Sequence, residues 1–493
     1  MGCVNGFAFN GHRSVLWHER EYEIPMGKYK ALARNAAIIS VGTILSKLVA
    51  FFMVRFYTGM LTPAQYGTGD LLITAVSLLM PFVSFGIGDG VFRFLPEYPD
   101  DAKSVFSIGI YTVTAGIAVL AALLTLMHWA GILQEYVPLL AFMVLSACYH
   151  SVCTQYVRAS GNTVLFAEQG LLNTLLVVAL NLLLLTVFRL GVAGYVLSVG
   201  LADLLSALFL IVAQRLWRYM TVHPNRELLK KMLHYSVPLI PTTVFWWITS
   251  VSDRYMISAM LGQDANGIYT VANKLPTMLT LLSGVLMQAW QYSAVSEAKS
   301  SPKEQAEFYS NVWLALLSAL FLTCSAMVAL TKIEIRLLAD SSYGAAWLYM
   351  PVLCTAMLFC SFNSFMGSVY TVTQQSKLSL WTSLLGATIN IVLNLLLIPS
   401  PLGIQGAALA TLVSYLVVFL VRAENVRHFI AFRLFKKDLL LSTVILIVQI
   451  TFICFALPGW KGVQLVAIAS IFLIGRMQIA GKISSFRTHT VDN

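Results

Sequence analysis

Four basic side chains stand inside long apolar runs of the sequence: Lys47, Arg55, Arg254 and Lys274. A charge at the centre of a membrane span costs about 2.5–3.5 kcal/mol on insertion scales, so such residues usually face a cavity or a partner. Lys47 and Arg55 are separated by about 80° around a helix of 3.6 residues per turn, so both could face one cavity. We interpret the four cations as a site for an anionic group. Arg55 and Lys274 also fit a simpler role, because they lie near span ends and could reach the membrane interface.

Two acidic residues, Asp253 and Asp203, occupy similar apolar surroundings. Asp253 precedes Arg254, but adjacent residues of a helix do not face each other. We therefore expect a partner for Asp253 on another helix, for example Lys47. Both acids could instead bind a coupling H⁺ or Na⁺, or take part in a gate.

Asp89 and Arg93 lie near the glycines of the segment FGIGDG and are spaced i, i+4. That spacing brings opposite charges together on a helix surface. It favours an ordinary ion pair at a helix end over a cytoplasmic gate.

The composition is that of a polytopic membrane protein. The 493 residues are 58% hydrophobic and 11% charged, whereas soluble domains carry about 25% charged residues. Apolar stretches long enough to cross about 30 Å of hydrocarbon as helices recur along the chain. They are too long and continuous for the strands of a barrel. The net charge of +10 reflects the Lys and Arg that collect in cytoplasmic loops rather than nucleic-acid binding.

The expected fold is all-α transmembrane, with about 14 helices. The predicted spans are 35–58, 69–92, 104–127, 136–157, 163–187, 192–213, 235–259, 268–291, 310–331, 346–372, 378–398, 403–422, 438–457 and 461–478. With the N-terminus inside, most of the 32 Lys and Arg, Arg422 included, fall in inside segments. The outside loops then hold Arg189, Lys332, Arg336 and Lys461. This bias predicts a multi-pass protein of the cytoplasmic membrane with both termini in the cytoplasm.

An internal repeat divides the spans into two sets of six. LTPAQYG at 61–67 closes the first apolar run, and LGQDANG at 261–267 closes the seventh. Asn181-Leu-Leu-Leu and Asn394-Leu-Leu-Leu recur late in each unit. Two units that enter the membrane in the same direction are related by an axis along the membrane normal, with the substrate site between them. The predicted organisation is a cytoplasmic segment 1–34, an N-lobe 35–213, a linker 214–234, a C-lobe 235–422, and two helices with a tail in 423–493.

These residues resemble the polysaccharide transporters of the multidrug/oligosaccharidyl-lipid/polysaccharide (MOP) superfamily. The matching stretches are LTPAQYGTGDLL, FGIGDGVFRFLPE, residues 237–276 with Ser-Asp-Arg at 252–254, and INIVLNLLLIPSPLGIQGAALAT. The resemblance covers about 30–430. It implies two six-helix lobes in a V shape like that of the MATE transporters, plus two C-terminal helices. It also implies a flippase that carries undecaprenyl-pyrophosphate-linked oligosaccharide outward by alternating access, for surface polysaccharide.

On this resemblance the cationic site holds the pyrophosphate of the cargo. Gln288, Trp290 and Gln291 at the end of span 8 could contact its sugars, although aromatic residues there more often form an interfacial belt. The implied partners are the lipid-linked oligosaccharide, membrane lipids, and a polysaccharide polymerase with its chain-length machinery. No cofactor is expected beyond a coupling H⁺ or Na⁺.

Two other functions were weighed. A drug/cation antiporter of the same fold would favour acidic residues in the N-lobe cavity, whereas the buried charges here are mainly cationic. A membrane-embedded polymerase or glycosyltransferase would need a large polar loop or a metal-binding acidic pair, and neither is visible. The sequence contains no phosphate-binding loop ending in Gly-Lys-Ser or Gly-Lys-Thr. We therefore expect a transporter that is neither an enzyme nor an ATPase.

Overall fold

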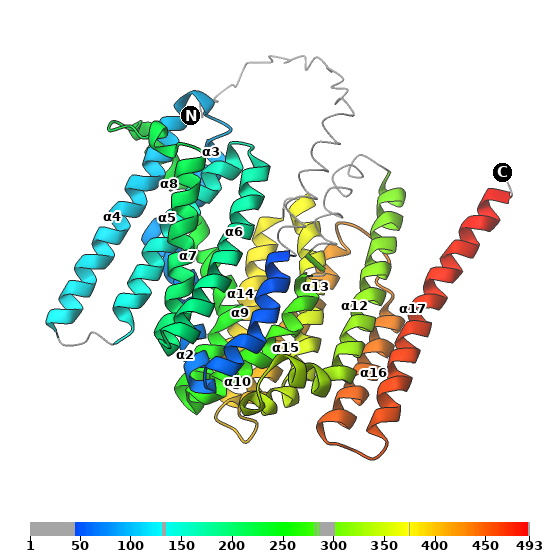
Figure 1. The fold of residues 1–493 in the computed structure, drawn as a ribbon. Coiled ribbons are helices and arrows are strands. Elements are labelled where there is room, and N and C mark those ends of the chain that lie inside the picture. Colours follow the sequence, from blue (N-terminus) through cyan, green and yellow to red (C-terminus); the bar gives the residue numbers. More distant parts are fainter. Residues whose placement is uncertain (1–44, 131–134, 282, 285–300, 374, 492–493) are drawn as a thin grey trace, which may run out of the picture.

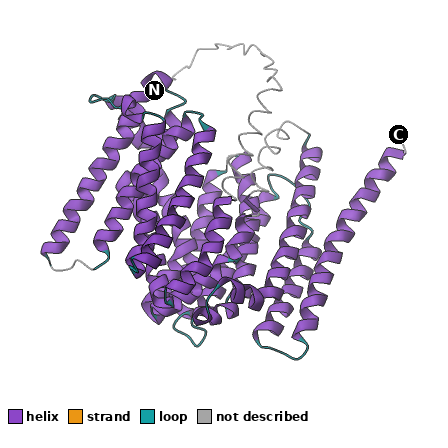
Figure 2. Cartoon of the chain, in the orientation of Figure 1, coloured by secondary structure: helices purple, strands orange, loops and turns teal. Residues whose placement is uncertain are grey.

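Helices make up the architecture, and no strand occurs in the described part of the chain (Figure 2). The structure is a computed structural model that describes residues 45–130, 135–281, 283–284, 301–373 and 375–491. The predicted all-α class is confirmed.

The first half of the molecule begins with the helix 45–60. It continues with α2 (Pro63–Ser84), α3 (Ile87–Phe94), α4 (Ala102–Trp129), α5 (Val137–Ala159), α6 (Thr163–Asn181) and α7 (Gly191–Ala213). A 3-10 turn, η1 (Pro99–Asp101), precedes α4, and a π-helical turn, η2 (Leu182–Val187), extends α6. The linker holds η3 (Leu216–Tyr219), α8 (Arg226–Ser236) and η4 (Val237–Leu239).

The second half contains α9 (Ile240–Leu261), α10 (Gln263–Lys274), α12 (Pro302–Leu338), η5 (Ser341–Leu348), α13 (Met350–Val372), α14 (Ser376–Leu397) and α15 (Ile404–Val426). Two further helices, α16 (Lys436–Cys454) and α17 (Trp460–Val491), pack on α12 at the right-hand edge of Figure 1.

The two halves repeat one packing scheme. In the first half α5 and α6 both pack on α7, and in the second half α13 and α14 both pack on α15. These are the fourth, fifth and sixth spans of each unit, so the predicted repeat is present in space as well as in sequence.

The halves meet where α2 contacts α9 and α10, low in the centre of Figure 1. These helices contain the repeated segments: α2 starts within LTPAQYG, α9 ends at the first residue of LGQDANG, and α10 starts within LGQDANG. Their junction carries the candidate site.

One predicted boundary is wrong, because LTPAQYG starts a helix instead of closing one. Thr62 caps α2 by accepting a hydrogen bond from the Gln65 backbone N–H, and the Gln65 side chain accepts one from Thr62 N–H. Pro63 fits the first helical position, where no N–H is needed. This capping box is a start signal that is readable in the sequence. The predicted span 69–92 therefore begins at Pro63, and it breaks at Phe85 and Gly86, which have φ of 51° and 63°.

Eleven helices of the described residues are long and apolar enough to cross a membrane. The other predicted spans are the first, seventh and eighth. The first and eighth extend into residues that are not described. The seventh, α9, has 22 residues but carries Asp253 and Arg254.

Candidate functional site

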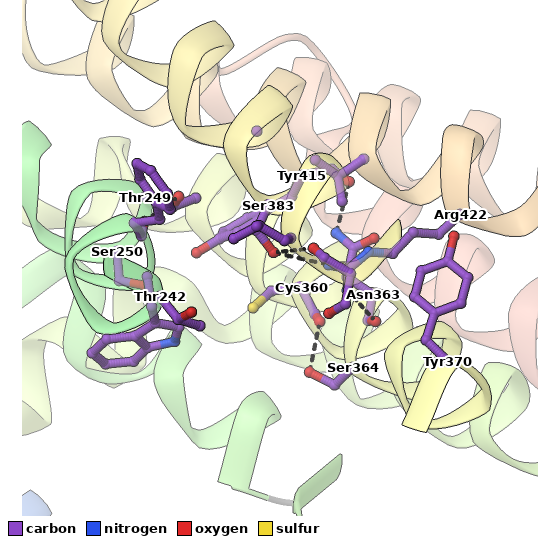
Figure 3. A pocket seen from close by; sticks show the side chains of 16 residues that line it. Thr242, Thr249, Ser250, Cys360, Asn363, Ser364, Tyr370, Ser383, Tyr415 and Arg422 are labelled. Atoms are coloured by element: carbon purple, nitrogen blue, oxygen red, sulfur yellow. Dashed lines mark hydrogen bonds between the residues drawn. The ribbon is translucent and has the colours of Figure 1, made fainter. Parts of the chain in front are cut away.

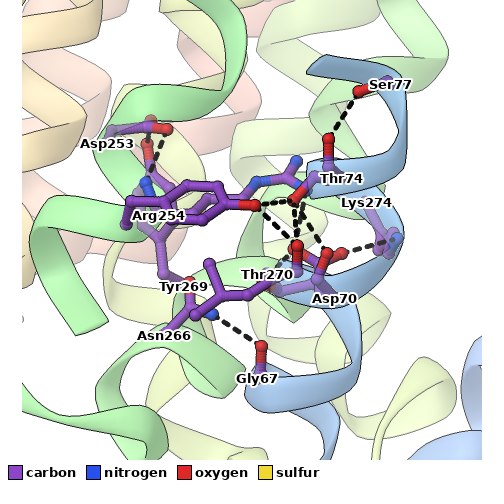
Figure 4. Close-up of polar contacts among 12 residues, drawn as sticks. Gly67, Asp70, Thr74, Ser77, Asp253, Arg254, Asn266, Tyr269, Thr270 and Lys274 are labelled. Carbon is purple, nitrogen blue, oxygen red and sulfur yellow. Dashed lines mark hydrogen bonds and ion pairs between the residues drawn. The ribbon is translucent and has the colours of Figure 1, made fainter. Parts of the chain in front are cut away.

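A buried carboxylate on α2, Asp70, lies at the centre of the junction and is only 4% exposed. Its Oδ2 accepts a hydrogen bond from Arg254 Nη1 at 2.8 Å and another from the Thr270 hydroxyl at 3.2 Å. Its Oδ1 lies 3.8 Å from Lys274 Nζ. Figure 4 shows these groups converging from α2, α9 and α10. An anion of the first half thus holds two cations of the second half.

Sequence reasoning missed Asp70, although it lies in the quoted stretch LTPAQYGTGDLL. Once the capping box places the start of α2 at Pro63, Asp70 falls two turns inside the helix. An acid at that depth needs a partner. The position of the helix start could therefore have identified Asp70 as a candidate residue from the sequence.

The predicted cationic residues divide into two groups. Arg254 and Lys274 meet at Asp70, and exposed Lys47 lies close enough to Lys274 for the two charges to repel. Arg55 instead donates through Nη1 to the carbonyl of Ala339, at the end of α12. Arg55 thus has a backbone partner, and its described contacts do not join it to the Asp70 cluster.

Neutral hydrogen bonds reinforce the junction. The indole N–H of Trp247 donates to Thr74 O at 3.0 Å, and the Tyr255 hydroxyl donates to Leu71 O at 2.6 Å. Asn266 Nδ2 donates to Gly67 O at 2.9 Å (Figure 4). Each bond joins a second-half side chain to a backbone carbonyl of α2, and each is worth about 1 kcal/mol net.

Asp253 is buried beside this junction, with 3% of its surface exposed. Its partners are the Tyr269 hydroxyl, the Thr411 hydroxyl at 3.5 Å, and the backbone N–H of Arg254 at 2.9 Å. The expectation of partners on other helices holds, since Tyr269 lies on α10 and Thr411 on α15. The ion pair with Lys47 that we considered is not formed.

Amides of α14 extend this polar cluster within the second half. Asn390 donates to the Thr411 hydroxyl at 3.4 Å, and Asn394 donates to Asn390 Oδ1 at 3.1 Å. Asn394 Oδ1 is buried and has no hydrogen-bond partner. The cluster around Asp253 therefore contains a buried acceptor oxygen that receives no hydrogen bond.

Asp203 belongs to a separate cluster in the first half. It accepts a hydrogen bond from Asn173 Nδ2 at 2.9 Å and lies 3.0 Å from His150 Nδ1. His150 Nε2 is 2.9 Å from Gln169 Oε1. His150 was not predicted, although it is an ionisable residue within an apolar run.

The remaining predicted residues lie elsewhere. Asp89 and Arg93 are both on α3, but the ion pair expected between them is not formed. Arg93 pairs with Glu97 at 3.7 Å instead, a pair whose members are both largely exposed. Gln288, Trp290 and Gln291 lie outside the described residues.

Two cavities flank α9 on one side of the junction. A cavity of about 410 Å³ lies against the first half and is lined by Ser77, Asp203 and Trp247, among others. A cavity of about 850 Å³ lies within the second half, among α9, α13, α14 and α15 (Figure 3). Trp246 lines both. Every α9 residue that lines either cavity precedes Asp253 in the chain, so along α9 both cavities lie on the N-terminal side of the ion pair.

The arrangement can form and break ion pairs between the two halves of the molecule. No group of three or more His, Cys, Asp or Glu side chains that could hold a metal ion is found in the part of the chain that the structure describes. The charged groups sit where two helix bundles touch. The ion pairs between these groups can therefore form or break as the bundles move.

The sequence matches known proteins over most of its length. A sequence model of a family described as "polysaccharide biosynthesis protein" matches residues 32–292, more than half of the chain. An uncharacterized membrane protein of Methanocaldococcus jannaschii is 21% identical over 446 residues, covering 79% of this chain and 97% of that protein.

Solved structures share the fold. The lipid II flippase MurJ in an inward closed conformation superposes with a TM-score of 0.66 at 13% identity, over 91% of this chain and 99% of MurJ. An inward-facing MATE multidrug resistance transporter gives 0.60 at 14% identity, over 78% and 94% of the two chains. A MOP superfamily transporter from Pyrococcus furiosus, described as having a binding pocket of reverse polarity, gives 0.53 at 16% identity, over 80% and 95%. The fold is that of the MOP superfamily.

Proposed function

Because the chain belongs to the polysaccharide biosynthesis protein family, we propose that it is a flippase for undecaprenyl-pyrophosphate-linked oligosaccharide. It moves repeat units across the cytoplasmic membrane by alternating access, for the synthesis of a surface polysaccharide. Family membership and the fold shared with MurJ and MATE proteins support a flippase or transporter of this superfamily. The lipid-linked oligosaccharide is our own assignment.

The observation that carries the proposal is the ion pair of Asp70 with Arg254 and Lys274. It ties the first half to the second at one end, and the two cavities that flank α9 lie on the other side of it. A molecule closed at one end with cavities beyond the closure corresponds to one state of an alternating-access transporter. In the opposite state these three side chains would separate.

We infer the direction of transport from the orientation that the charge bias of the loops predicts. With both termini in the cytoplasm, the α2–α10 junction closes the outer side and the cavities face inward. Cargo would then enter from the cytoplasmic leaflet while Asp70 holds the outer side shut.

The cargo's pyrophosphate is the group that requires cations. Arg254 and Lys274 meet at Asp70, and the charge of Lys47 acts on Lys274, whereas Asp70 and Asp253 supply two negative charges. An excess of positive charge next to a cavity attracts an anionic head group. When the junction opens, Asp70 would leave Arg254 and Lys274 free to follow the pyrophosphate.

Asp253 is our candidate for binding a coupling H⁺ or Na⁺. Its carboxylate accepts from the Thr411 hydroxyl, and a chain of hydrogen bonds leads from Thr411 through Asn390 to Asn394, whose Oδ1 is unpaired. Oxygen ligands of this kind suit a hard cation. Asp253 also adjoins Arg254, so a charge bound there would change the field at the junction. Asp203 with His150 is the competing location.

The test is the fate of the lipid-linked oligosaccharide in cells that lack the protein. A flippase predicts accumulation of this lipid on the cytoplasmic face, and restored export by the wild-type gene. Lys47→Ala and Arg254→Ala should insert normally and restore little export, with Arg254→Lys as the charge-keeping control. A polymerase or glycosyltransferase would instead leave unpolymerised or unextended lipid on the outer face. Normal export combined with altered sensitivity to cationic drugs would favour the antiporter.

A further inference from the structure

The second-half cavity of about 850 Å³ lies apart from the ion pair at the junction. Its lining mixes hydroxyl and amide side chains with aromatic ones. Figure 3 shows Thr242, Thr249 and Ser250 of α9 along one wall, and Arg422 with Tyr370 at the far end. A volume of this size suits a small ligand or one sugar unit with its phosphate.

Arg422 is the charged residue of this lining. The prediction placed it at the end of a span among the loop cations, but α15 continues to Val426 and Arg422 is only 9% exposed. Its guanidinium donates to the Thr382 hydroxyl at 2.9 Å, the backbone carbonyl of Asn363 at 3.0 Å and the Ser383 hydroxyl at 3.1 Å. All three acceptors are neutral.

The positive charge of Arg422 therefore has no carboxylate partner among the described residues. Buried charges are usually paired, because removing an ion from water is costly. The three hydrogen bonds fix the orientation of the guanidinium without neutralising it. A site of this kind is preorganised for an anion that is not part of the chain.

A second observation points to a ligand at the same end of the cavity. Asn363 Oδ1 and the Tyr370 hydroxyl are buried, with no hydrogen-bond partner, and both residues line the cavity. Native proteins leave few such atoms unpaired. The Tyr370 hydroxyl can donate to an anion, and Asn363 Oδ1 can accept from a sugar hydroxyl.

The opposite wall supplies a surface for a sugar ring. Trp246 on α9 lines the cavity and is 64% exposed, so its indole faces open space. A flat aromatic face can pack on the apolar face of a sugar, while Thr249 and Ser250 offer hydroxyls beside it.

We infer that this cavity binds a glycosyl phosphate, with Arg422 holding the phosphate and Trp246 packing on the sugar. The inference rests on the proposed flippase function and deepens it, because it names where the head group sits once it has entered. It also gives the second half its own anion site, separate from the Asp70 cluster. Cargo could then bind while Asp70, Arg254 and Lys274 remain paired.

The experiment measures binding to the purified full chain in detergent, by titration calorimetry, with inorganic pyrophosphate, glucose 1-phosphate and free glucose as probes. Wild type should bind both phosphates saturably. Arg422→Gln should weaken the binding of both about tenfold or more, the usual size of a lost hydrogen bond to a charged group. Trp246→Ala should weaken glucose 1-phosphate several-fold and leave pyrophosphate unchanged. Arg427→Gln, at the C-cap of the same helix but exposed and paired with Glu424, is the matched control and should bind like wild type.

Ser364→Trp guards against a folding defect in Arg422→Gln. Ser364 is exposed in the cavity and bonds only to the Cys360 carbonyl of its own helix. The indole should block both phosphates without touching the hydrogen bonds of Arg422.

The inference is overturned if wild type binds neither phosphate, if Ser364→Trp binds like wild type, or if Arg427→Gln loses as much affinity as Arg422→Gln. The cellular assay separates this result from the proposed function. If export continued without the protein, the proposed flippase function would be rejected, while an Arg422-dependent anion site would still be supported by the binding data. Accumulation of lipid-linked oligosaccharide, together with phosphate binding indifferent to Arg422, would keep the flippase and discard the site.

Discussion

Gly67 and Gly267 are equivalent residues of the two repeats, and their backbones meet at the junction of the two halves. A Cβ on Gly67 would lie 2.8 Å from Gly267 N, and one on Gly267 would lie 2.0 Å from Pro63 O. Asp70 and Thr270 are also equivalent by position, and they share a hydrogen bond of 3.2 Å. Equivalent residues can touch only near a symmetry axis, so the pseudo-twofold axis passes through this junction.

Gly267→Val should separate α2 from α10 at the junction, because the side chain would overlap the Pro63 carbonyl. We expect a longer and broader distance between spin labels at Met60→Cys and Leu402→Cys, two exposed positions in different halves, and a lower melting temperature. Double electron–electron resonance measures the distance. Gly170→Ala is the control, since a Cβ there meets nothing within 4 Å. An unchanged distance in Gly267→Val would show that the junction is not closed by this contact.

Asp70→Asn should destabilise the closed state by about 3–5 kcal/mol, because it leaves Arg254 buried without its anion. Chemical unfolding in detergent, followed by tryptophan fluorescence, measures the loss. Glu97→Gln breaks an exposed ion pair with Arg93 and should cost at most about 1 kcal/mol.

Arg254→Gln combined with Asp70→Asn should recover part of that loss, because residues in direct contact are coupled by about 0.5–3 kcal/mol. The double-mutant cycle needs the two single variants and the pair in the same detergent. Additive effects would mean that the 2.8 Å contact contributes nothing to the closed state.

Asp253→Asn should abolish the dependence of transport on a Na⁺ or H⁺ gradient and leave the Asp70 ion pair in place. Transport into proteoliposomes, with each gradient imposed in turn, is the measurement. Asp203→Asn serves as the comparison, because Asp203 is a second, half-buried acid of the predicted coupling set. Loss of gradient dependence in Asp203→Asn alone would move the coupling site to the first half.

Lys47→Gln and Arg55→Gln should behave differently, although both cations were predicted for one site. Arg55 holds the end of α12 through the Ala339 carbonyl, so its loss should cost about 1–2 kcal/mol of stability with transport retained. Lys47 neighbours Lys274, so its loss should reduce transport about tenfold or more with stability retained. The same transport defect in both variants would restore the single four-cation site.

Local sequence signals predicted the helices and the two repeat units of the fold. Long apolar runs predict helices wherever a chain crosses lipid, because backbone groups must be satisfied within the segment. The repeat of LTPAQYG and LGQDANG predicted two units, and the packing of α5, α6 and α7 recurs in α13, α14 and α15. The predicted start of the second span was wrong because the capping box of Thr62 and Gln65 starts α2 at Pro63, before the apolar run begins.

The sequence by itself determined which residues had to be special: charges such as Arg254, Lys274 and Asp253 cannot remain in lipid without a partner or a cavity. Only the tertiary structure decided what satisfies them. Asp70 lies 184 positions from Arg254 in the chain, and although the helix start at Pro63 places it two turns inside α2, nothing local indicates its partner. Arg422 shows the converse, since its position near a span end looked like a loop, while the packing of α13, α14 and α15 buries it without a counter-ion. Partner choice between distant helices depends on how the two bundles dock, and docking is a property of whole surfaces rather than of any one stretch of sequence.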